Sequence, residues 1–214
     1  DSESDQIDML FIPRDTYYHE EGRDRGDQRK LNAAYGRGGG EEAKKAVEDI
    51  LYPVPIHHYV VLKYEGVEEM VNLLGGVEVD VPEGIEDLQP GRQVLNGKQA
   101  VNFLRFRAGY PEGDLGRIKA QQQFIRSAIQ KVSIPKLPFL AKKIFPYLET
   151  DISKEKMVSY AVSAAKVRKE DIFMHVLPGT AQYRTIDAKA WSYFFHDVQE
   201  TTKLLEILYH VETN

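Results

Sequence analysis

The sequence predicts an α/β fold of layered strands and helices. Three observations lead to this prediction of a globular α/β protein. Runs typical of strands, such as Val77–Val81, alternate along the chain with segments whose apolar residues recur at helical spacing, such as Arg117–Val132. The chain has 214 residues, 42% hydrophobic and 29% charged, which suits a compact globular protein. No apolar run approaches the ~18 to 20 residues that span a membrane. We therefore expect one domain over residues 1–214, or a tightly fused pair.

The N-terminal quarter is expected to place a polar turn at the end of a buried strand. The apolar run Ile7–Ile12 predicts a strand, which Pro13 ends. The charged segment Glu20–Lys30 contains two glycines and predicts an exposed loop. Apolar residues at helical spacing, with acids in the first turn, predict a helix over Glu41–Leu51.

The remaining elements alternate in the same way. Strands are predicted over residues 56–64, 77–81 and 172–177, and helices over residues 67–74, 97–103, 117–132, 154–166 and 187–208. Asn96 is expected to cap the helix that follows it, because an Asn side chain accepts hydrogen bonds from the first free amides. Residues 85–95 predict a loop, and residues 135–146 predict a proline-punctuated apolar linker.

Composition excludes several classes of site. Lys and Arg number 28 against 33 Asp and Glu, a net charge of −5, which argues against a surface built throughout for nucleic acid. The absence of cysteine excludes disulfides, thiol catalysis and Cys-ligated zinc. His57 and His58 are expected on opposite faces of a strand, and the other histidines lack the spacing of metal ligands. The sequence also lacks a Walker loop and a nucleophile-elbow motif.

The densest candidate for an anion site is Leu104-Arg105-Phe106-Arg107. In an extended segment alternate side chains share a face, so Arg105 and Arg107 would point together while the two apolar side chains enter the core. Arginine suits phosphate because its planar fork binds two oxygens and keeps its charge when partly buried. The alternative is a surface cluster that pairs with Glu112 and Asp114.

Three further segments present groups for the same anion. Arg117 is expected at the start of a long helix, whose N-terminal amides favour an anion, with Gln121 one turn later on the same face. Arg14 follows a buried strand, where α/β folds place binding groups, and a local ion pair with Asp15 is its alternative. Lys30 stands in a third segment, and for it too the alternative to binding the anion is a local ion pair. Together these segments suit a polyanionic ligand.

These segments, in this order, resemble the LytR-CpsA-Psr family of bacterial cell-envelope proteins. The resemblance covers roughly residues 6–132, and residues 133–214 match in general character. The motifs that carry it are Ile12-Pro13-Arg14-Asp15-Thr16, Lys30-Leu31-Asn32-Ala33-Ala34-Tyr35, Leu74 through Pro82, Leu95 through Ala100, Arg105-Phe106-Arg107, Gly113 through Arg117 and Gln121-Gln122. The resemblance implies an α/β layered sandwich with a central mixed β-sheet flanked by helices. It also implies an extracellular domain, anchored in the bacterial cell membrane by an N-terminal transmembrane helix.

The resemblance further implies the chemistry. Family members bind polyprenyl pyrophosphate, with the lipid tail in an apolar tunnel, and transfer glycopolymers such as teichoic acid or capsule onto peptidoglycan. A peptidoglycan hydroxyl would attack the sugar-proximal phosphorus and polyprenyl phosphate would leave, while arginines and Mg²⁺ stabilise the charge. Carried over by motif, the site consists of the pyrophosphate-binding Arg14, Arg105, Arg107 and Arg117, the adjacent Lys30 and Gln121, and the orienting Asp15 and Asp114.

Two departures from the family pattern bear on this site. The magnesium-binding aspartates of the family would fall upstream of Asp1, and Asp5 and Asp8 are poor substitutes, so we expect the metal site to be incomplete in this chain. Ala120 stands where the family usually has a second Arg, and Ala108 stands where it usually has His. Both departures reduce the positive charge.

Other functions and roles stay open at this point. A non-catalytic protein that binds lipid pyrophosphate would carry the same arginines. A DNA-binding regulator, a label often given to proteins of this family, would need a basic recognition helix, whereas the helices here have mixed charge. The sequence does not decide the general base, for which Asp15, Asp114 and an aspartate upstream of Asp1 are equal candidates. The sequence does not specify the glycopolymer, the acceptor position or the oligomeric state.

Overall fold

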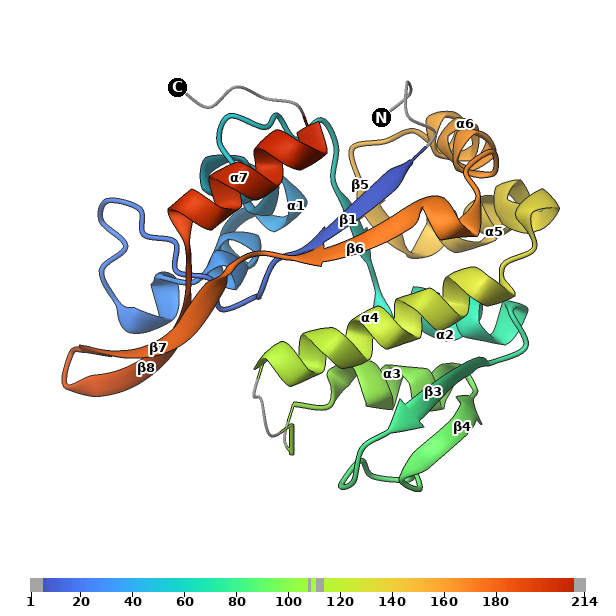
Figure 1. Cartoon of the computed structure of the whole chain (residues 1–214), viewed down its shortest axis with the longest axis horizontal. Coiled ribbons are helices and arrows are strands. Elements are labelled where there is room, and N and C mark those ends of the chain that lie inside the picture. The colour runs from blue at the N-terminus through green and yellow to red at the C-terminus, as the bar shows by residue number, and fades with distance from the viewer. Residues whose placement is uncertain (1–5, 108, 111–113, 210–214) are drawn as a thin grey trace. The chain divides into compact units, whose positions relative to one another are not determined.

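The computed structural model describes residues 6–107, 109–110 and 114–209, and Figure 1 shows its elements. The chain divides into two compact units, which we call the larger and the smaller unit. The larger unit comprises Asp1–Ile7 and Val60–Met174, and the smaller comprises Asp8–Tyr59 and His175–Asn214. That residues 1–214 form a single domain stays a prediction.

The α/β class that the sequence predicts is confirmed. Within the described residues the strands pair two by two: β1 with β6, β2 with β5, β3 with β4, and β7 with β8. The last three pairs are antiparallel. Because a lone two-stranded sheet is only marginally stable in water, each pair depends on packing against the rest of the protein.

In the larger unit the core lies between β3 and three helices. Its elements are β2 (Val60–Leu62), α2 (Tyr64–Leu73), β3 (Val77–Val81), β4 (Gly91–Leu95), α3 (Gly97–Arg105), α4 (Asp114–Lys131), α5 (Leu137–Ile144), β5 (Leu148–Thr150) and α6 (Lys154–Ala164), with 3-10 turns at Ile134–Lys136, Phe145–Tyr147 and Lys169–Asp171. Val71 of α2, Val77 of β3 and Leu95 of β4 are fully buried. Phe103 of α3 joins them, and its ring centroid lies 6.4 Å from that of Phe124 on α4. The α2, α3 and α4 helices are thereby held together.

The smaller unit is built around a long helix and a hairpin. Its elements are β1 (Ile7–Phe11), a 3-10 turn at Gly26–Gln28, α1 (Leu31–Ile50), the end of β6 (Ile172–Val176), β7 (Gly179–Ile186), β8 (Lys189–His196) and α7 (Val198–Tyr209). Its core joins Ala34 and Ala46 of α1 to Leu177, Phe194 and Leu205. The turn after β1 is packed against this core and carries the first candidate site residues.

Two helical segments differ from the prediction. The range of α1 begins at Leu31, but its backbone is non-helical at Gly38 and Gly39, so it consists of two helices joined at a kink, and the second contains the predicted helix from Glu41. The φ angle of Gly39 is 67°, a conformation that glycine adopts without strain, so the glycine run separates an unpredicted first helix from the predicted second one. The segment 135–146, predicted as a linker, contains α5, because Pro138 stands in the first turn, where no helical amide is lost.

Four strands were missed, namely β4, β5, β7 and β8. The predicted helix over 187–208 is wrong in its first half, since Lys189–His196 is β8 and pairs with β7 in a long hairpin (Figure 1). Asp187 and Ala188 make its turn with positive φ angles of 52° and 60° and no glycine, so the usual hairpin signal is absent. Residues 91–95, predicted as part of a loop, form β4, which pairs with β3 along its whole length.

Candidate functional site

The turn that follows β1 is fixed by hydrogen bonds of its own. Thr16 is fully buried, and its amide and hydroxyl donate to the Pro13 carbonyl at 3.0 and 2.6 Å. Phe194 of β8 donates its amide to the Asp15 carbonyl at 2.9 Å. These bonds leave the side chains of Arg14 and Asp15 projecting from a well-defined backbone.

The same turn is bonded to the start of α1. The Leu31 amide donates to the Thr16 carbonyl at 2.9 Å, and the Asn32 amide donates to the Arg14 carbonyl at 3.1 Å. Lys30 is the residue that precedes the helix. The first amides of α1 are therefore already used, so positive charge at this point comes from the side chains of Arg14 and Lys30 rather than from the helix terminus.

Asp15 lies between these two cationic side chains. Its Oδ1 atom lies 3.5 Å from Arg14 Nε and 3.2 Å from Lys30 Nζ. The local ion pair that sequence analysis gave as an alternative for Arg14 is thus present. Yet Arg14 Nε and Asp15 Oδ1 are buried atoms that make no hydrogen bond of acceptable geometry to any described residue. Because buried polar atoms are nearly always satisfied, this turn has capacity for a further polar ligand.

Lys30 is held by an aromatic ring as well as by Asp15. Its ammonium lies 5.6 Å from the ring centroid of Tyr193, and the Tyr193 hydroxyl donates to the Gly26 carbonyl at 2.8 Å. Burial raises the pKa of Tyr193, so the ring stays neutral at physiological pH. The ion pair and the ring together direct the lysine toward the turn.

In the larger unit, Arg105 is placed by the end of α3. The helix is capped as predicted: Asn96 accepts from the Gln99 amide at 3.0 Å, and the Asn96 amide donates to the Gln99 side chain. It extends to Arg105, so the prediction of an extended segment is wrong for Leu104 and Arg105. The exposed Arg105 guanidinium lies 5.3 Å from the ring centroid of Tyr64, at the start of α2.

The arginines that follow differ in burial. Arg107 is exposed, whereas Arg117, in the first turn of α4, is only 9% exposed. Tyr110 lies close by: its ring packs edge-on against Phe106 with centroids 5.5 Å apart, and a side chain at Gly116 would contact it. Burial raises the pKa of the Tyr110 hydroxyl, and the charge of Arg117 opposes that rise. Arg117 is thus a buried guanidinium that lies within electrostatic reach of a neutral tyrosine.

The predicted residues fall into two groups, one in each unit: Arg14, Asp15 and Lys30, and Arg105, Arg107, Arg117 and Gln121. The first three lie in direct contact. Gln121 is half-buried one turn after Arg117. Asp114 is the first residue of α4, but its side chain, like Glu112 and Ala108, lies outside the described residues. The convergence of the four arginines on one ligand stays a prediction.

Three tyrosines of the site were missed by sequence reasoning. Tyr64 and Tyr193 contact Arg105 and Lys30 from distant parts of the chain, so no local pattern indicates them. Tyr110 stands four residues after Phe106, a spacing that gave no signal because the intervening segment is not regular.

No metal centre is found in the described part of the chain, where no group of three His, Asp or Glu side chains could hold an ion. Asp8 is engaged elsewhere, since its Oδ1 lies 2.8 Å from Nε2 of His175 in a hydrogen bond. Asp5 lies outside the described residues. Among the helices described, none combines the length and apolar character needed to cross a membrane.

Both the sequence and the fold are similar to those of known proteins. The model of the LytR_cpsA_psr family matches residues 1–210. TagV of Bacillus subtilis, named a polyisoprenyl-teichoic acid–peptidoglycan teichoic acid transferase, is 33% identical over 167 residues, which cover 71% of this chain and 42% of TagV. TagU of Enterococcus faecalis, named likewise, is 32% identical over 179 residues, covering 78% and 58%. The chain spans about half the length of these relatives.

Solved structures share the fold. The crystal structure of Bacillus subtilis TagV superimposes with a TM-score of 0.77 at 27% identity, covering all 100% of this chain and 87% of that one. A protein described as a transcriptional regulator from Enterococcus faecalis gives 0.79 at 26% identity, with 100% and 81% covered. TagT bound to LI-WTA gives 0.75 at 22% identity, with 98% and 80% covered, a likeness of fold alone.

Proposed function

The chain belongs to the LytR-CpsA-Psr family, and on that premise we propose that it is a cell-envelope phosphotransferase. It moves a glycopolymer such as teichoic acid from a polyprenyl pyrophosphate carrier onto peptidoglycan, a reaction class supported by the names of two relatives. The structural observation that carries the proposal is the turn after β1. There a buried Arg14 Nε lies beside Asp15 and Lys30 and lacks a hydrogen-bond acceptor among the described residues. A phosphate oxygen supplies such an acceptor.

The transfer is a displacement at phosphorus. A hydroxyl of the peptidoglycan glycan attacks the phosphorus that carries the sugar, and a new P–O bond forms to the acceptor. The bond from that phosphorus to the bridging oxygen breaks, and polyprenyl phosphate leaves with the electron pair. The hydroxyl proton passes to a base, for which Asp15 and Asp114 are the candidates in this chain. Negative charge grows on the bridging oxygen, so fixed cations around it accelerate the step.

The side chains divide that work by their chemistry. Arg14 and Arg117 are partly or largely buried, so their charges are poorly screened and act strongly on a bound anion. Lys30 contributes a compact charge held by Asp15. The exposed Arg105 and Arg107 are suited to capture the pyrophosphate from solution or from a lipid surface.

Magnesium is part of the proposal, but the described residues do not fit it. The ion needs several oxygen ligands, whereas Asp8 is bonded to His175 and Asp15 stands between two cations. No step above depends on the ion. Aspartates upstream of Asp1 would bind it, and it would then neutralise charge on the leaving oxygen.

We place this chemistry on the outer face of the bacterial cell membrane. The donor is held there by its lipid, and the acceptor is peptidoglycan. An N-terminal transmembrane helix outside this chain would keep the domain near both.

Binding of geranylgeranyl pyrophosphate, a soluble polyprenyl pyrophosphate, tests the proposal. Arg14→Ala and Arg107→Ala should each weaken binding about tenfold or more, the scale of a hydrogen bond to a charged group. Arg126→Ala, which removes an exposed arginine of α4 outside the site, is the matched control and should bind like the unaltered chain. Circular dichroism confirms that each variant folds.

Three outcomes separate the functions. Unchanged affinity in a folded Arg14→Ala, Arg107→Ala double variant refutes the anion site. Tight binding without release of polyprenyl phosphate in the presence of peptidoglycan and magnesium, from this chain and from a longer version alike, favours the non-catalytic binder. Loss of DNA binding with lipid pyrophosphate binding intact favours the regulator.

A further inference from the structure

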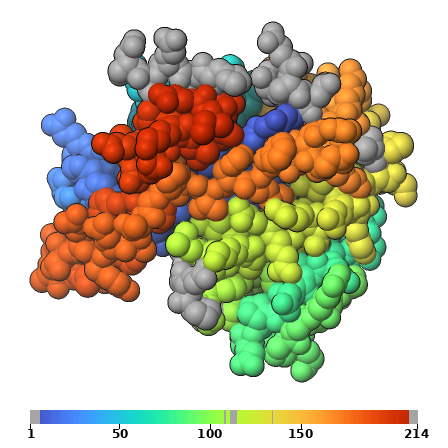
Figure 2. Space-filling view, viewed as in Figure 1, coloured from blue at the N-terminus to red at the C-terminus, as the bar shows by residue number. Residues whose placement is uncertain are grey.

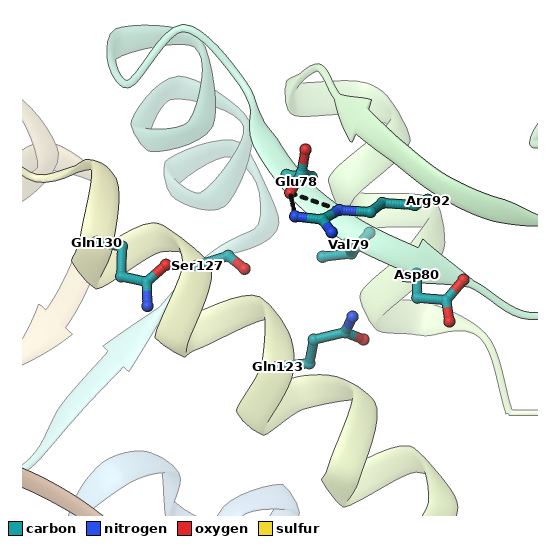
Figure 3. A pocket seen from close by; sticks show the side chains of 7 residues that line it. All are labelled: Glu78, Val79, Asp80, Arg92, Gln123, Ser127 and Gln130. Carbon is teal, nitrogen blue, oxygen red and sulfur yellow. Dashed lines mark hydrogen bonds and ion pairs between the residues drawn. The ribbon is translucent and has the colours of Figure 1, made fainter.

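A polar pocket lies in the larger unit, and none of the arginines discussed above lines it. It has a volume of about 370 Å³ and is lined by Glu78, Val79 and Asp80 of β3, Arg92 of β4, and Gln123, Ser127 and Gln130 of α4. Figure 3 shows the three α4 side chains projecting from the side of the helix that faces the strands. In Figure 2 the residues of α4 and of the hairpin formed by β3 and β4 are exposed on one face of the molecule.

Spacing on the two elements creates this pocket. Gln123, Ser127 and Gln130 are four and three residues apart, so they form one stripe on α4. Alternation in β3 turns the valines inward and leaves Glu78 and Asp80 toward solvent. The packing of α4 along β3, seen in Figure 1, brings the polar stripe next to the strand, where it lines one pocket together with Glu78, Asp80 and Arg92.

The polar groups of this pocket are largely uncommitted. The side chains of Asp80, Gln123, Ser127 and Gln130 make no hydrogen bond to any residue in the described part of the chain. Arg92 donates from Nε and Nη2 to a single oxygen of Glu78, at 2.8 and 2.5 Å. The second carboxylate oxygen of Glu78 makes no bond within the described part of the chain. Donors and acceptors are therefore available side by side.

The chemistry of the lining selects among ligands. Two acids face one arginine, so the lining carries a net negative charge, which disfavours phosphate and other anions. Val79 is the only apolar side chain in the lining, so a lipid tail would leave the polar groups without partners. Sugar hydroxyls both donate and accept, so a glutamine amide can bond to them in either role and a carboxylate can accept from them.

We propose that this pocket is a binding subsite for a neutral saccharide. Its volume is at the small end of ligand pockets, which suits a short stretch of a sugar chain rather than a large ligand. The sugar comes either from an N-acetylated glycan such as the acceptor or from the glycopolymer of the donor. Only this choice of sources rests on the proposed function, because the pocket contains none of the arginines assigned to pyrophosphate.

The test uses the whole chain and three short oligosaccharides. Chitotriose is neutral and N-acetylated, maltotriose is neutral without acetamido groups, and trigalacturonate is anionic. Two-dimensional NMR follows the side-chain amide signals of Gln123 and Gln130 during titration. We expect saturable shifts of both signals with at least one neutral trisaccharide and none with trigalacturonate. Tighter binding of chitotriose would identify an N-acetylated glycan such as the acceptor as the source. Tighter binding of maltotriose would identify the glycopolymer of the donor.

Two variants make the test specific to the pocket. A Gln123→Leu, Gln130→Leu double variant keeps side-chain size and helix propensity but removes the amides, and it should lower the sugar affinity about tenfold or more. Gln199→Leu alters an exposed glutamine of α7 and should leave the affinity unchanged. Geranylgeranyl pyrophosphate binding should be equal in the unaltered chain and in both variants. A chain that binds the pyrophosphate but no sugar would therefore refute the saccharide subsite and leave the proposed function intact. Absent shifts with neutral sugars, shifts with trigalacturonate alone, or full affinity in the folded double variant would overturn the proposal.

Discussion

Arg105 should bind lipid pyrophosphate in an orientation that Tyr64 imposes. The guanidinium lies 5.3 Å from the tyrosine ring, and both side chains are largely exposed. A cation–π contact at an exposed site is worth about 0.5 to 1 kcal/mol, so Tyr64→Leu should weaken binding about two- to fivefold. Arg105→Ala removes the charge itself and should cost about 1.5 to 3 kcal/mol, or roughly tenfold to more than a hundredfold.

The double variant decides whether the tyrosine acts through the arginine. If Tyr64 only positions Arg105, then Tyr64→Leu should have no effect in a chain that already carries Arg105→Ala. Calorimetric titration with geranylgeranyl pyrophosphate at fixed ionic strength measures all four chains. Tyr183→Leu, at a site 77% exposed, is the control for loss of a surface tyrosine. Additive losses, or a larger loss from Tyr64→Leu than from Arg105→Ala, would refute this reasoning and would make Tyr64 a direct contact of the lipid.

Three further predictions concern stability and the metal. Burial lowers the pKa of His196 below 6.5, and the negative charge of Asp197 opposes this shift. As the pH falls, the unfolded chain therefore binds a proton at this histidine before the folded chain does. Stability is full above about pH 6.5 and falls as the pH drops toward the lowered pKa. Urea unfolding at about pH 7.5 and 5.5 should show this loss, and His196→Phe should reduce it. Asn96→Ala removes the cap of α3 and should cost about 1 kcal/mol of unfolding free energy, while Gln199→Leu should change it little. If the metal-binding aspartates lie upstream of Asp1, this chain should bind lipid pyrophosphate with little response to magnesium. A longer version should then release polyprenyl phosphate only with the ion, and magnesium-dependent turnover by the 214-residue chain at the same rate would contradict this.

Much of the candidate site could be predicted because its segments are determined locally. The cap of α3 follows from Asn96 and Gln99, three residues apart. The turn after β1 follows from an apolar strand stopped by Pro13, and it is closed by Thr16 three residues later. Such short-range hydrogen bonds depend on neighbouring residues alone, so the order of residues is enough to predict them.

The errors in the predicted secondary structure arose where helix continuation or pairing with a distant strand outweighed the conformation that the local pattern favours. Leu104 and Arg105 alternate like a strand, but α3 extends through both, and the Phe106 amide that follows still donates to the carbonyls of Asn102 and Phe103. The aromatic run of β8 shows no clear period, and its strand conformation depends on its partner β7.

By itself, the sequence determined the α/β class, the cap of α3 at Asn96, and the cationic residues offered to an anion. Only the tertiary structure decided which groups surround them. It set the ring of Tyr64 beside Arg105, buried Arg117 near Tyr110, and brought the polar stripe of α4 to the hairpin of β3 and β4. The physical reason is sequence separation. These contacts join segments that meet only when the core closes, and packing against that core selects them.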